Sequence, residues 1–273
     1  MNHSGVPSTD QQNSSGGSLR GCRVLGLMAK YWTPGQVKTR LGRSIGMQRS
    51  ARLHQLFVQH LCQTLGDVGS IREFVAAPDD ALATLATQLT SPWTLVAQSD
   101  GDLGERMKTW FRRHLTGAPA ADTEAVSNAT NRPAYSRGPL AHESGDKRIV
   151  LIGADCPTLS PGELERSFDT LVDHDVVLGP AADGGYYLVG INSRCADAAT
   201  VMFDVMTWSN SDVLATTRDR LRLAEISFTE LPIREDVDTI VELHSLRDDL
   251  IAGPDLQPLL ESIDQILVSE DLS

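Results

Sequence analysis

A carboxylate at the end of an apolar run is the first candidate for chemistry in this sequence. Asp155 closes the run 149–156 (IVLIGADC), and Pro157 follows it before a helical pattern begins. A carboxylate at the carboxyl end of a strand and beside a helix start is well placed to hold a divalent cation against phosphate oxygens. The pattern therefore predicts Asp155 as a metal ligand. The alternative is structural, because an aspartate before a proline commonly caps a turn.

A second acidic cluster occupies residues 235–239 (EDVDT) and precedes a helical pattern with Ile240, Leu243 and Leu250 on one side. Asp238 is its candidate for ligand binding. The competing interpretation is stronger here than at Asp155, because an aspartate at a helix start is a good N-cap whatever the protein does.

The segment 33–43 (TPGQVKTRLGR) is a candidate phosphate-binding loop, since it follows the first predicted strand and Pro34 and Gly35 force a turn. Lysine offers a phosphate a point charge, and arginine offers it a two-pronged donor. No carboxylate lies nearby in the sequence to pair with Lys38 and Arg40. We therefore expect the loop, including Gly35, to contact the phosphates of a ligand.

Charge is distributed unevenly along the chain. The net charge is -12, yet residues 20–66 contain eight Lys or Arg and no Asp or Glu, so the remainder carries -20. A small anionic ligand would be drawn to the basic segment. The negative net charge of the whole chain argues against general nucleic-acid binding. A solvated basic helix face is an equally good explanation for Arg49 and Arg52.

A glycine-rich turn, DGGY, separates two predicted strands. Gly184 and Gly185 permit a tight turn and close approach of a ligand to the backbone, while Asp183 and Tyr186 could hydrogen-bond to the ligand or stack on it. These four residues are candidates for binding an acceptor. A plain hairpin turn is the alternative.

Another polar segment, 100–106 (DGDLGER), follows a predicted strand and opens a helix. Ligands collect at such positions in α/β proteins, so Asp102, Gly104 and Arg106 are candidate nucleotide-binding residues. The same charges could simply be solvated residues at the start of a helix.

Common nucleotide-binding and hydrolase motifs give little support to other classes of enzyme. Neither GxxxxGK[ST] nor GxGxxG occurs, which argues against a P-loop NTPase and a dinucleotide-binding Rossmann domain. Residues 42–46 (GRSIG) match GxSxG. A hydrolase built on Ser44 is nevertheless a distant alternative, because no predicted strand leads into that serine as a nucleophile elbow requires.

The elements that must position these residues alternate between strands and helices. Apolar runs predict strands, and the spacing of Leu and Phe predicts helices around 53–61 and 164–171. Ser160, Pro161 and Glu163 give the second of these helices a clear N-terminus. The order strand, loop, helix predicts βαβ units and a mostly parallel sheet. The predicted strands are 23–29, 71–76, 93–97, 148–153, 175–178 and 186–191.

We expect one α/β domain over residues 21–252, preceded by a disordered tail (1–20) and followed by a helical extension (253–273). Residues 117–146 are rich in Ala, Pro, Ser and Asn, and strand patterns continue on both sides, which predicts a flexible insertion. No apolar stretch is long enough to cross a membrane, and residues 1–20 lack the centre of a secretion signal, so a cytoplasmic enzyme is expected.

Taken together, five segments of this chain resemble a bacterial glycosyltransferase-A-like family of the radical-SAM/selenodomain-associated transferase type. The resemblance covers most of residues 24–246. The segments are AKYWTPGQVKTRL (29–41), DGDLGERM (100–107), IGADCPTLSPGEL (152–164), VVLGPAADGGYYLVGI (176–191) and EDVDT (235–239).

The resemblance implies the three-layer α/β/α, Rossmann-like fold of nucleotide-diphospho-sugar transferases. It also implies Mg²⁺ or Mn²⁺ held by Asp155 and Asp238. Phosphate contacts fall on Lys38 and Arg40, with Lys30 as a further candidate. The DGGY turn would then lie near the second substrate.

The expected function is transfer of a glycosyl or nucleotidyl group from a nucleotide-sugar or nucleoside triphosphate to a small acceptor, with Asp155 and Lys38 as catalytic residues. Metal and cations would neutralise the charge that develops on the phosphates. The alternative is a nucleotide-binding regulatory module that keeps the fold without catalysis. The sequence does not distinguish the two kinds of transfer, and it does not fix the oligomeric state.

Overall fold

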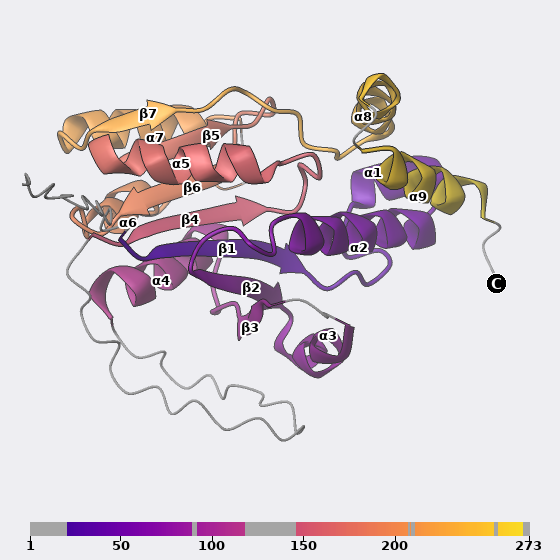
Figure 1. Cartoon of the computed structure of the whole chain (residues 1–273), viewed down its shortest axis with the longest axis horizontal. Helices are drawn as coiled ribbons and strands as arrows, with labels where there is room; N and C mark the ends of the chain where they lie inside the picture. The colour runs from indigo at the N-terminus through magenta and orange to yellow at the C-terminus, as the bar shows by residue number, and fades with distance from the viewer. Residues whose placement is uncertain are drawn as a thin grey trace, which may run out of the picture.

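The computed structural model describes residues 21–88, 92–117, 146–206, 208, 211–253 and 256–269. The predicted tail (1–20) and all but the two end residues of the predicted insertion (117–146) lie outside the described residues. The described strands form one seven-stranded sheet in the order β3-β2-β1-β4-β6-β5-β7 (Figure 1). Their bounds are β1 Arg23–Lys30, β2 Ile71–Ala77, β3 Thr94–Ala97, β4 Arg148–Gly153, β5 Val176–Pro180, β6 Tyr186–Asn192 and β7 Phe228–Glu230.

The sheet is mostly parallel, as the sequence predicts. Strand β1 pairs in parallel with β2 and β4, β2 with β3, and β5 with β7. Only β6 is antiparallel within this sheet, and it pairs with β4 on one side and β5 on the other. Each of the six predicted strands is present within one or two residues of its expected bounds, and β7 is the strand that the pattern does not reveal.

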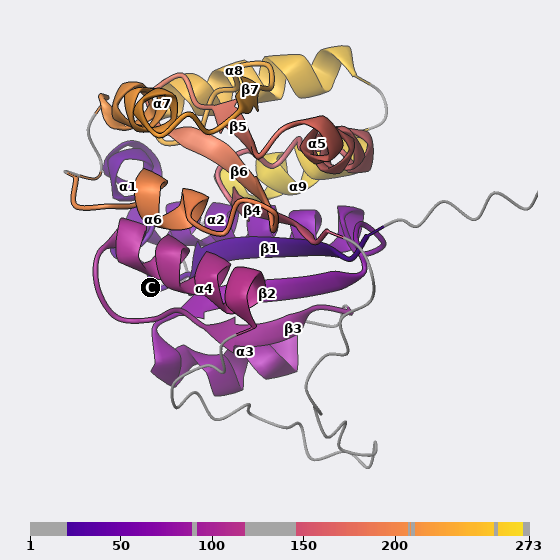
Figure 2. The ribbon, with the colours of Figure 1, turned by 90° about the vertical axis from the view of Figure 1, so that its left-hand side faces the viewer.

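Helices cover both faces of the sheet, giving three layers (Figures 1 and 2). One core cluster joins the sheet to α2, α3 and α5, and the other joins it to α4, α6 and α7. The helix bounds are α1 Thr39–Ile45, α2 Met47–Thr64, α3 Leu82–Gln88, α4 Leu103–Thr116, α5 Pro161–Asp173, α6 Ala198–Met202, α7 Val213–Leu223, α8 Ile240–Ala252 and α9 Gln257–Val268, with a short 3₁₀ turn at Asp79–Ala81.

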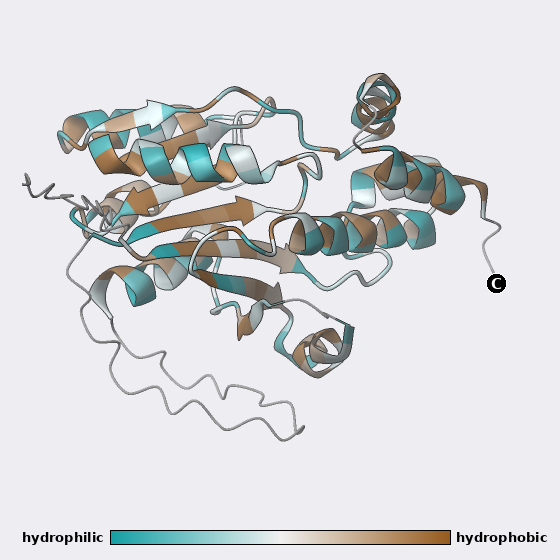
Figure 3. Cartoon of the chain, viewed as in Figure 1, coloured by the Kyte–Doolittle hydropathy of each residue, from teal (hydrophilic) through white to brown (hydrophobic). Residues whose placement is uncertain are grey.

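Hydropathy follows this layering, since hydrophobic colour gathers on the central strands while α2 and α5 alternate along their length (Figure 3). Helix α5 begins as predicted, because the Ser160 hydroxyl accepts from the Glu163 amide and Glu163 reaches back to the Ser160 amide. This capping box satisfies two amide donors that a helix start otherwise leaves without partners. It fixes the turn that follows Asp155.

A third apolar cluster lies beyond the carboxyl ends of β1 and β4, where α1 and α2 pack with α8 and α9. Leu41, Phe57 and Leu243 are fully buried there. This helical group holds the loops that follow β1 and precede α8 on the same side of the sheet (Figure 1). None of the described helices is both long enough and apolar enough to cross a membrane.

Candidate functional site

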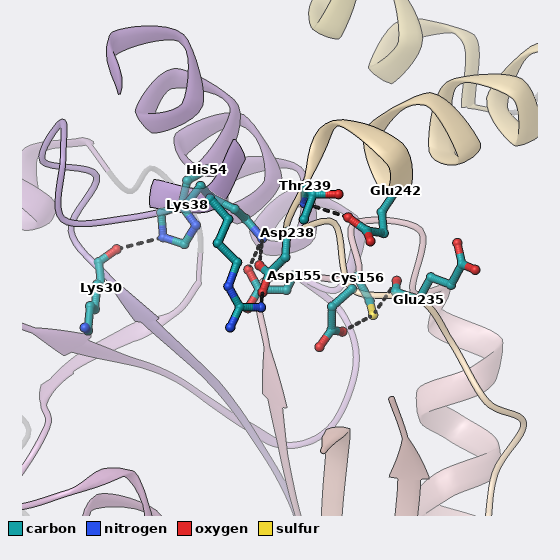
Figure 4. Close-up of polar contacts among 11 residues, drawn as sticks. Lys30, Lys38, His54, Asp155, Cys156, Glu235, Asp238, Thr239 and Glu242 are labelled. Atoms are coloured by element: carbon teal, nitrogen blue, oxygen red, sulfur yellow. Dashed lines mark hydrogen bonds and ion pairs between the residues drawn. The ribbon is translucent and has the colours of Figure 1, made fainter. Parts of the chain in front are cut away.

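Three charged residues from distant parts of the chain meet beyond the end of β4 (Figure 4). The Lys38 ammonium donates to the Asp155 carboxylate and to Asp238 Oδ1, the latter over 3.3 Å. Arg40 Nη1 lies 3.8 Å from the other oxygen of Asp238. The structure therefore brings together both predicted metal ligands and both cations of the predicted phosphate loop.

The fold presents each of the three from a loop at the carboxyl edge of the sheet. Lys38 has a left-handed backbone, with φ 47°, at the N-cap of α1. Such a conformation is uncommon for a residue with a side chain and occurs often at functional sites. Asp155 lies two residues after the end of β4, and its carbonyl accepts from the Val237 amide over 3.0 Å. That bond ties the Asp155 loop to the segment that carries Asp238.

Asp238 is not the N-cap of α8, contrary to the structural alternative suggested by the sequence. Thr239 is the N-cap, and its hydroxyl accepts from the Val241 amide while Glu242 accepts from the Thr239 amide. Because Thr239 satisfies the helix start, the carboxylate of Asp238 is available for other partners.

Burial differs sharply between the cation and its two partners. The Lys38 side chain is 2% exposed, whereas those of Asp155 and Asp238 are 44% and 41% exposed. Burial alone would lower the pKa of Lys38, but the two carboxylates raise it above its ordinary value, so the amine stays charged. Partial desolvation opposes ionisation of Asp155, and the Lys38 charge nevertheless lowers the pKa of that carboxyl group below its ordinary value.

Lys38 and Arg40 have no carboxylate nearby in the sequence, but in the folded protein both lie beside carboxylates. Their partners lie far away in the sequence, Asp155 by 117 positions and Asp238 by 200 positions from Lys38. Folding thus brings these cations next to carboxylates that lie far away in the sequence. Phosphate contact by either cation stays a prediction.

Two cavities open on either side of this charged cluster. The first has a volume of about 430 Å³ and is lined by Lys30, Lys38 and Arg106 together with Gln36, Gln98 and His54. We call it the donor cavity, and the second the acceptor cavity, after the roles that are proposed for them below. The second, the acceptor cavity, has a volume of about 350 Å³ and is lined by Arg40, Asp183, Gly185 and Tyr186. Asp155 and Asp238 line both cavities, so the cluster lies where the two meet.

The residues predicted in the 100–106 segment have structural partners. Asp102 is the N-cap of α4, since its carboxylate accepts from the Glu105 amide over 2.9 Å. Arg106 donates to the Gly101 carbonyl over 2.9 Å and to Gln98 Oε1 over 3.2 Å. Gly104 lies against Trp208, where a Cβ atom would approach the indole to 2.1 Å. Of the three, Arg106 lines the donor cavity.

The glycines predicted to bind ligands have roles in the conformation and packing of the backbone. Gly35 has φ 79° in an exposed turn, and Gly184 has φ 92° with the Ser211 carbonyl so close that a Cβ atom would lie 2.1 Å from it. Gly184 therefore admits another segment of the protein as a close neighbour. Asp183 closes the same turn by accepting from the Gly185 amide over 2.9 Å, and it also faces the acceptor cavity.

Ser44 lies within α1, near its C-terminal end, and is exposed. No strand leads into it, so the nucleophile elbow required by the hydrolase alternative is not formed. That alternative is wrong.

Sequence reasoning missed Gln98, His54 and Trp208. Gln98 directly follows β3, and its amide donates to the carbonyls of Ala29 and Val75, each over 3.0 Å. The rule that singled out Asp155, a polar residue just after a strand, could have identified it. His54 and Trp208 have no comparable signal, because one lies within a helix and the other within a connecting loop.

The two exposed carboxylates fit a divalent cation that shares its coordination with a ligand. Magnesium is typically held by one or two carboxylates together with substrate phosphates. Among the described residues, no group of three or more His, Cys, Asp or Glu side chains could hold a metal alone. Because Asp155 and Asp238 both contact the Lys38 ammonium, their carboxylates lie close together, and a divalent cation would share them with this ammonium.

One family model and several solved structures match this chain. The model described as "Uncharacterized protein conserved in bacteria (DUF2064)" matches residues 61–210. A protein of Desulfovibrio desulfuricans G20, provisionally assigned as a nucleotide-diphospho-sugar transferase, is 28% identical with a TM-score of 0.72, over 90% of this chain and 96% of that chain. No curated protein matches.

Among the other matching structures, two examples have lower TM-scores. A CMP:2-keto-3-deoxy-manno-octonic acid synthetase complexed with CTP is 12% identical with a TM-score of 0.49, over 86% of this chain and 100% of that chain. Rv0371C of Mycobacterium tuberculosis H37Rv, in complex with manganese, is 13% identical with a TM-score of 0.41, over 82% and 97%. The predicted glycosyltransferase-A-like α/β fold is confirmed by the Desulfovibrio structure. The radical-SAM-associated type stays a prediction.

Proposed function

The chain belongs to the DUF2064 family, and from that premise we propose a metal-dependent transferase that moves a glycosyl or nucleotidyl group from a nucleotide to a small acceptor. The observation that carries the proposal is the meeting of two cavities at Asp155 and Asp238. A transfer reaction needs two substrates whose reacting ends touch, and a shared carboxylate pair provides one place for both. The provisional assignment of the Desulfovibrio protein supports a transferase in general terms.

The donor cavity suits the phosphates of a nucleotide. Lys30, Lys38 and Arg106 contribute three positive charges to its lining, and cations at such a site lower the energy of the developing phosphate charge. A divalent cation held by Asp155 and Asp238 would neutralise further charge on the same phosphates. In this arrangement Lys38, fixed beside both carboxylates, stands next to the leaving phosphate.

The acceptor cavity holds the nucleophile. Its hydroxyl oxygen forms a bond to the transferred carbon or to the α-phosphorus, and the bond from that atom to the leaving phosphate oxygen breaks. The leaving group takes the electron pair as nucleoside diphosphate or pyrophosphate, and the hydroxyl proton passes to water at the open side of the cavity. Alignment of these atoms is the main task of the protein.

The test is to incubate the protein with labelled nucleoside triphosphates and a panel of nucleotide-sugars, with Mg²⁺, Mn²⁺ or a chelator. Release of pyrophosphate identifies nucleotidyl transfer, and release of nucleoside diphosphate identifies glycosyl transfer. Asp155→Asn is nearly isosteric and removes one charge, so metal-dependent nucleotide affinity should fall by about tenfold or more. Asp238→Asn should behave in the same way.

Asp173→Asn is the matched control, because Asp173 is exposed at the far end of α5, about 18 Å of helix from the Asp155 loop. It should leave binding and turnover unchanged. Unchanged metal dependence in Asp155→Asn would contradict the assignment of the metal site. Tight metal-dependent binding without any turnover would instead favour the nucleotide-binding regulatory module.

A further inference from the structure

The acceptor cavity has an apolar floor, which is unusual beside a charged cluster. Its floor is the face of the sheet that bears Met28 of β1, Leu151 of β4 and Val189 of β6. Leu151 and Val189 are direct cross-strand partners, and they are 5% and 2% exposed. Met28 packs at the edge of the same core cluster. The cavity is therefore an opening into the core beneath α4, and it offers a ligand few polar partners there.

The walls continue this apolar surface. Leu103 and Met107 of α4 face Val213 of α7 and the indole of Trp208 around the cavity. Trp208 is fixed against the start of α4, because Gly104 has no side chain that would collide with the ring. Leu103 is 46% exposed although it borders a core. Covering such surface with an apolar ligand group is favourable, since that group and the wall both leave water.

The opposite end of the cavity is acidic. Asp155, Asp183, Asp236 and Asp238 line it, and Arg40 is the one cation in the same lining among the described residues. The charge of Lys38 is already directed at Asp155 and Asp238. With a divalent cation bound, the four carboxylates would be balanced by that cation, Lys38 and Arg40, so no net positive charge remains at this end. An anionic acceptor would lose its hydration without a compensating attraction there.

We propose that the acceptor is a non-anionic amphipathic alcohol or amine, with an apolar or aromatic body and a single nucleophilic head. The body lies between Trp208 and the sheet floor, and the head lies at the Asp155 end. This assignment rests on the proposed function and narrows its substrate class. A sugar or sugar phosphate fits poorly, because its hydroxyl groups would lack partners against the apolar floor and its phosphate would face carboxylates.

Three small probes separate the requirements for the body and the head. 2-Phenylethanol has both features, 3-phenylpropanoate keeps the ring but carries a negative charge, and glucose 6-phosphate lacks the apolar body. Binding of each to the full chain, saturated with Mg²⁺ and nucleotide, is measured by ligand-observed NMR. We expect 2-phenylethanol to bind at least about tenfold more tightly than either anion. Equal or tighter binding of glucose 6-phosphate overturns the proposal.

Matched leucine variants locate the binding site. Leu103→Ser removes an apolar part of the cavity wall. Leu223→Ser is the matched control, because it makes the same change at a leucine that is 86% exposed at the end of α7. We expect Leu103→Ser and Trp208→Ala each to weaken 2-phenylethanol binding by about tenfold, and Leu223→Ser to leave it unchanged. Nucleotide affinity should stay unchanged in Trp208→Ala, because Trp208 lines the acceptor cavity and not the donor cavity, and in Leu223→Ser. Binding of 2-phenylethanol that none of these variants affects places the probe elsewhere and overturns the proposal.

The proposed function and this inference fail in different ways. Transfer to phosphorylated sugars with no binding of 2-phenylethanol retains the transferase and rejects the amphipathic acceptor. Cavity-specific binding of 2-phenylethanol with no turnover of any nucleotide donor retains the chemistry of the cavity and rejects the transferase.

Discussion

Two charged clusters in this protein use the same kinds of residue in opposite ways. At the carboxyl edge of the sheet, a buried lysine lies beneath two carboxylates that are each more than 40% exposed. In the second cluster the arrangement is reversed. Glu73 of β2 is 1% exposed and lies beneath Arg113 and His114 of α4, which are 20% and 11% exposed.

The hydrogen bonds of the second cluster explain the difference. Glu73 Oε2 accepts from Trp110 Nε1 over 2.9 Å, from His114 Nε2 over 3.0 Å and from Arg113. All three donors meet one oxygen of a side chain that is 1% exposed, so a ligand has little access to Glu73, and the carboxylate links α4 to the sheet. Asp155 and Asp238 instead present exposed oxygens to two cavities. Exposure of the carboxylates, and not charge alone, distinguishes the candidate site from a structural cluster.

The largest effect that we predict is the loss of protein stability when the Glu73 cluster is disrupted. Glu73→Ala removes the acceptor of a buried network and should lower the free energy of unfolding by about 3 to 5 kcal/mol. Urea denaturation followed by tryptophan fluorescence measures this change. Asp155→Ala should cost about 1 kcal/mol or less, because its carboxylate is 44% exposed and Lys38 keeps Asp238 as a partner. Similar costs for both variants would remove the distinction between the clusters.

Lys38→Met should have a smaller effect that depends on metal. Without the ammonium, two partly exposed carboxylates face each other, and their repulsion should cost about 1 to 2 kcal/mol. Mg²⁺ should raise the melting temperature of this variant more than that of the wild type, because the cation replaces the missing charge. Arg40→Met is the control, since Arg40 is 62% exposed and should change stability by less than about 0.5 kcal/mol. Equal Mg²⁺ shifts in all three proteins would argue against a metal between the two carboxylates.

Much of the fold follows from the sequence because strands and cap motifs are local signals. The runs that became β1 and β4 are apolar enough to predict both strands, and the Ser160 capping box fixes the start of α5. Strand β7 was missed because its three residues, Phe228–Glu230, are too few to show a period.

The site follows from the sequence only in part. Asp155 and Asp238 stand out by position, yet their shared contact with Lys38 depends on tertiary packing across 117 and 200 residues. The role of Thr239 as N-cap in place of Asp238 is likewise decided by local geometry, because both residue types can cap a helix. Glu73 was also missed, although a charged residue inside a strand, here followed by the apolar run Phe74–Ala77, is a visible signal of a buried partner.

The smallest predicted effect is the response of the Glu73 cluster to acid. Burial alone would raise the pKa of Glu73. His114 and Arg113 lower this pKa by more than burial raises it, so the folded value lies below the ordinary 4.5. A carboxyl group whose pKa is lower in the folded protein contributes stability above its unfolded pKa and loses that contribution as pH falls through the folded pKa. The stability advantage of the wild type over Glu73→Gln should therefore hold from pH 7 to about 5 and shrink as the pH falls further to about 3. Glu230→Gln, at a 29% exposed carboxylate paired with Arg218, should show a weaker change, because solvent screens that pair. Urea unfolding at a series of pH values measures both, and an advantage that stays constant for Glu73 would mean that the buried carboxyl group is not ionised in the folded protein at neutral pH.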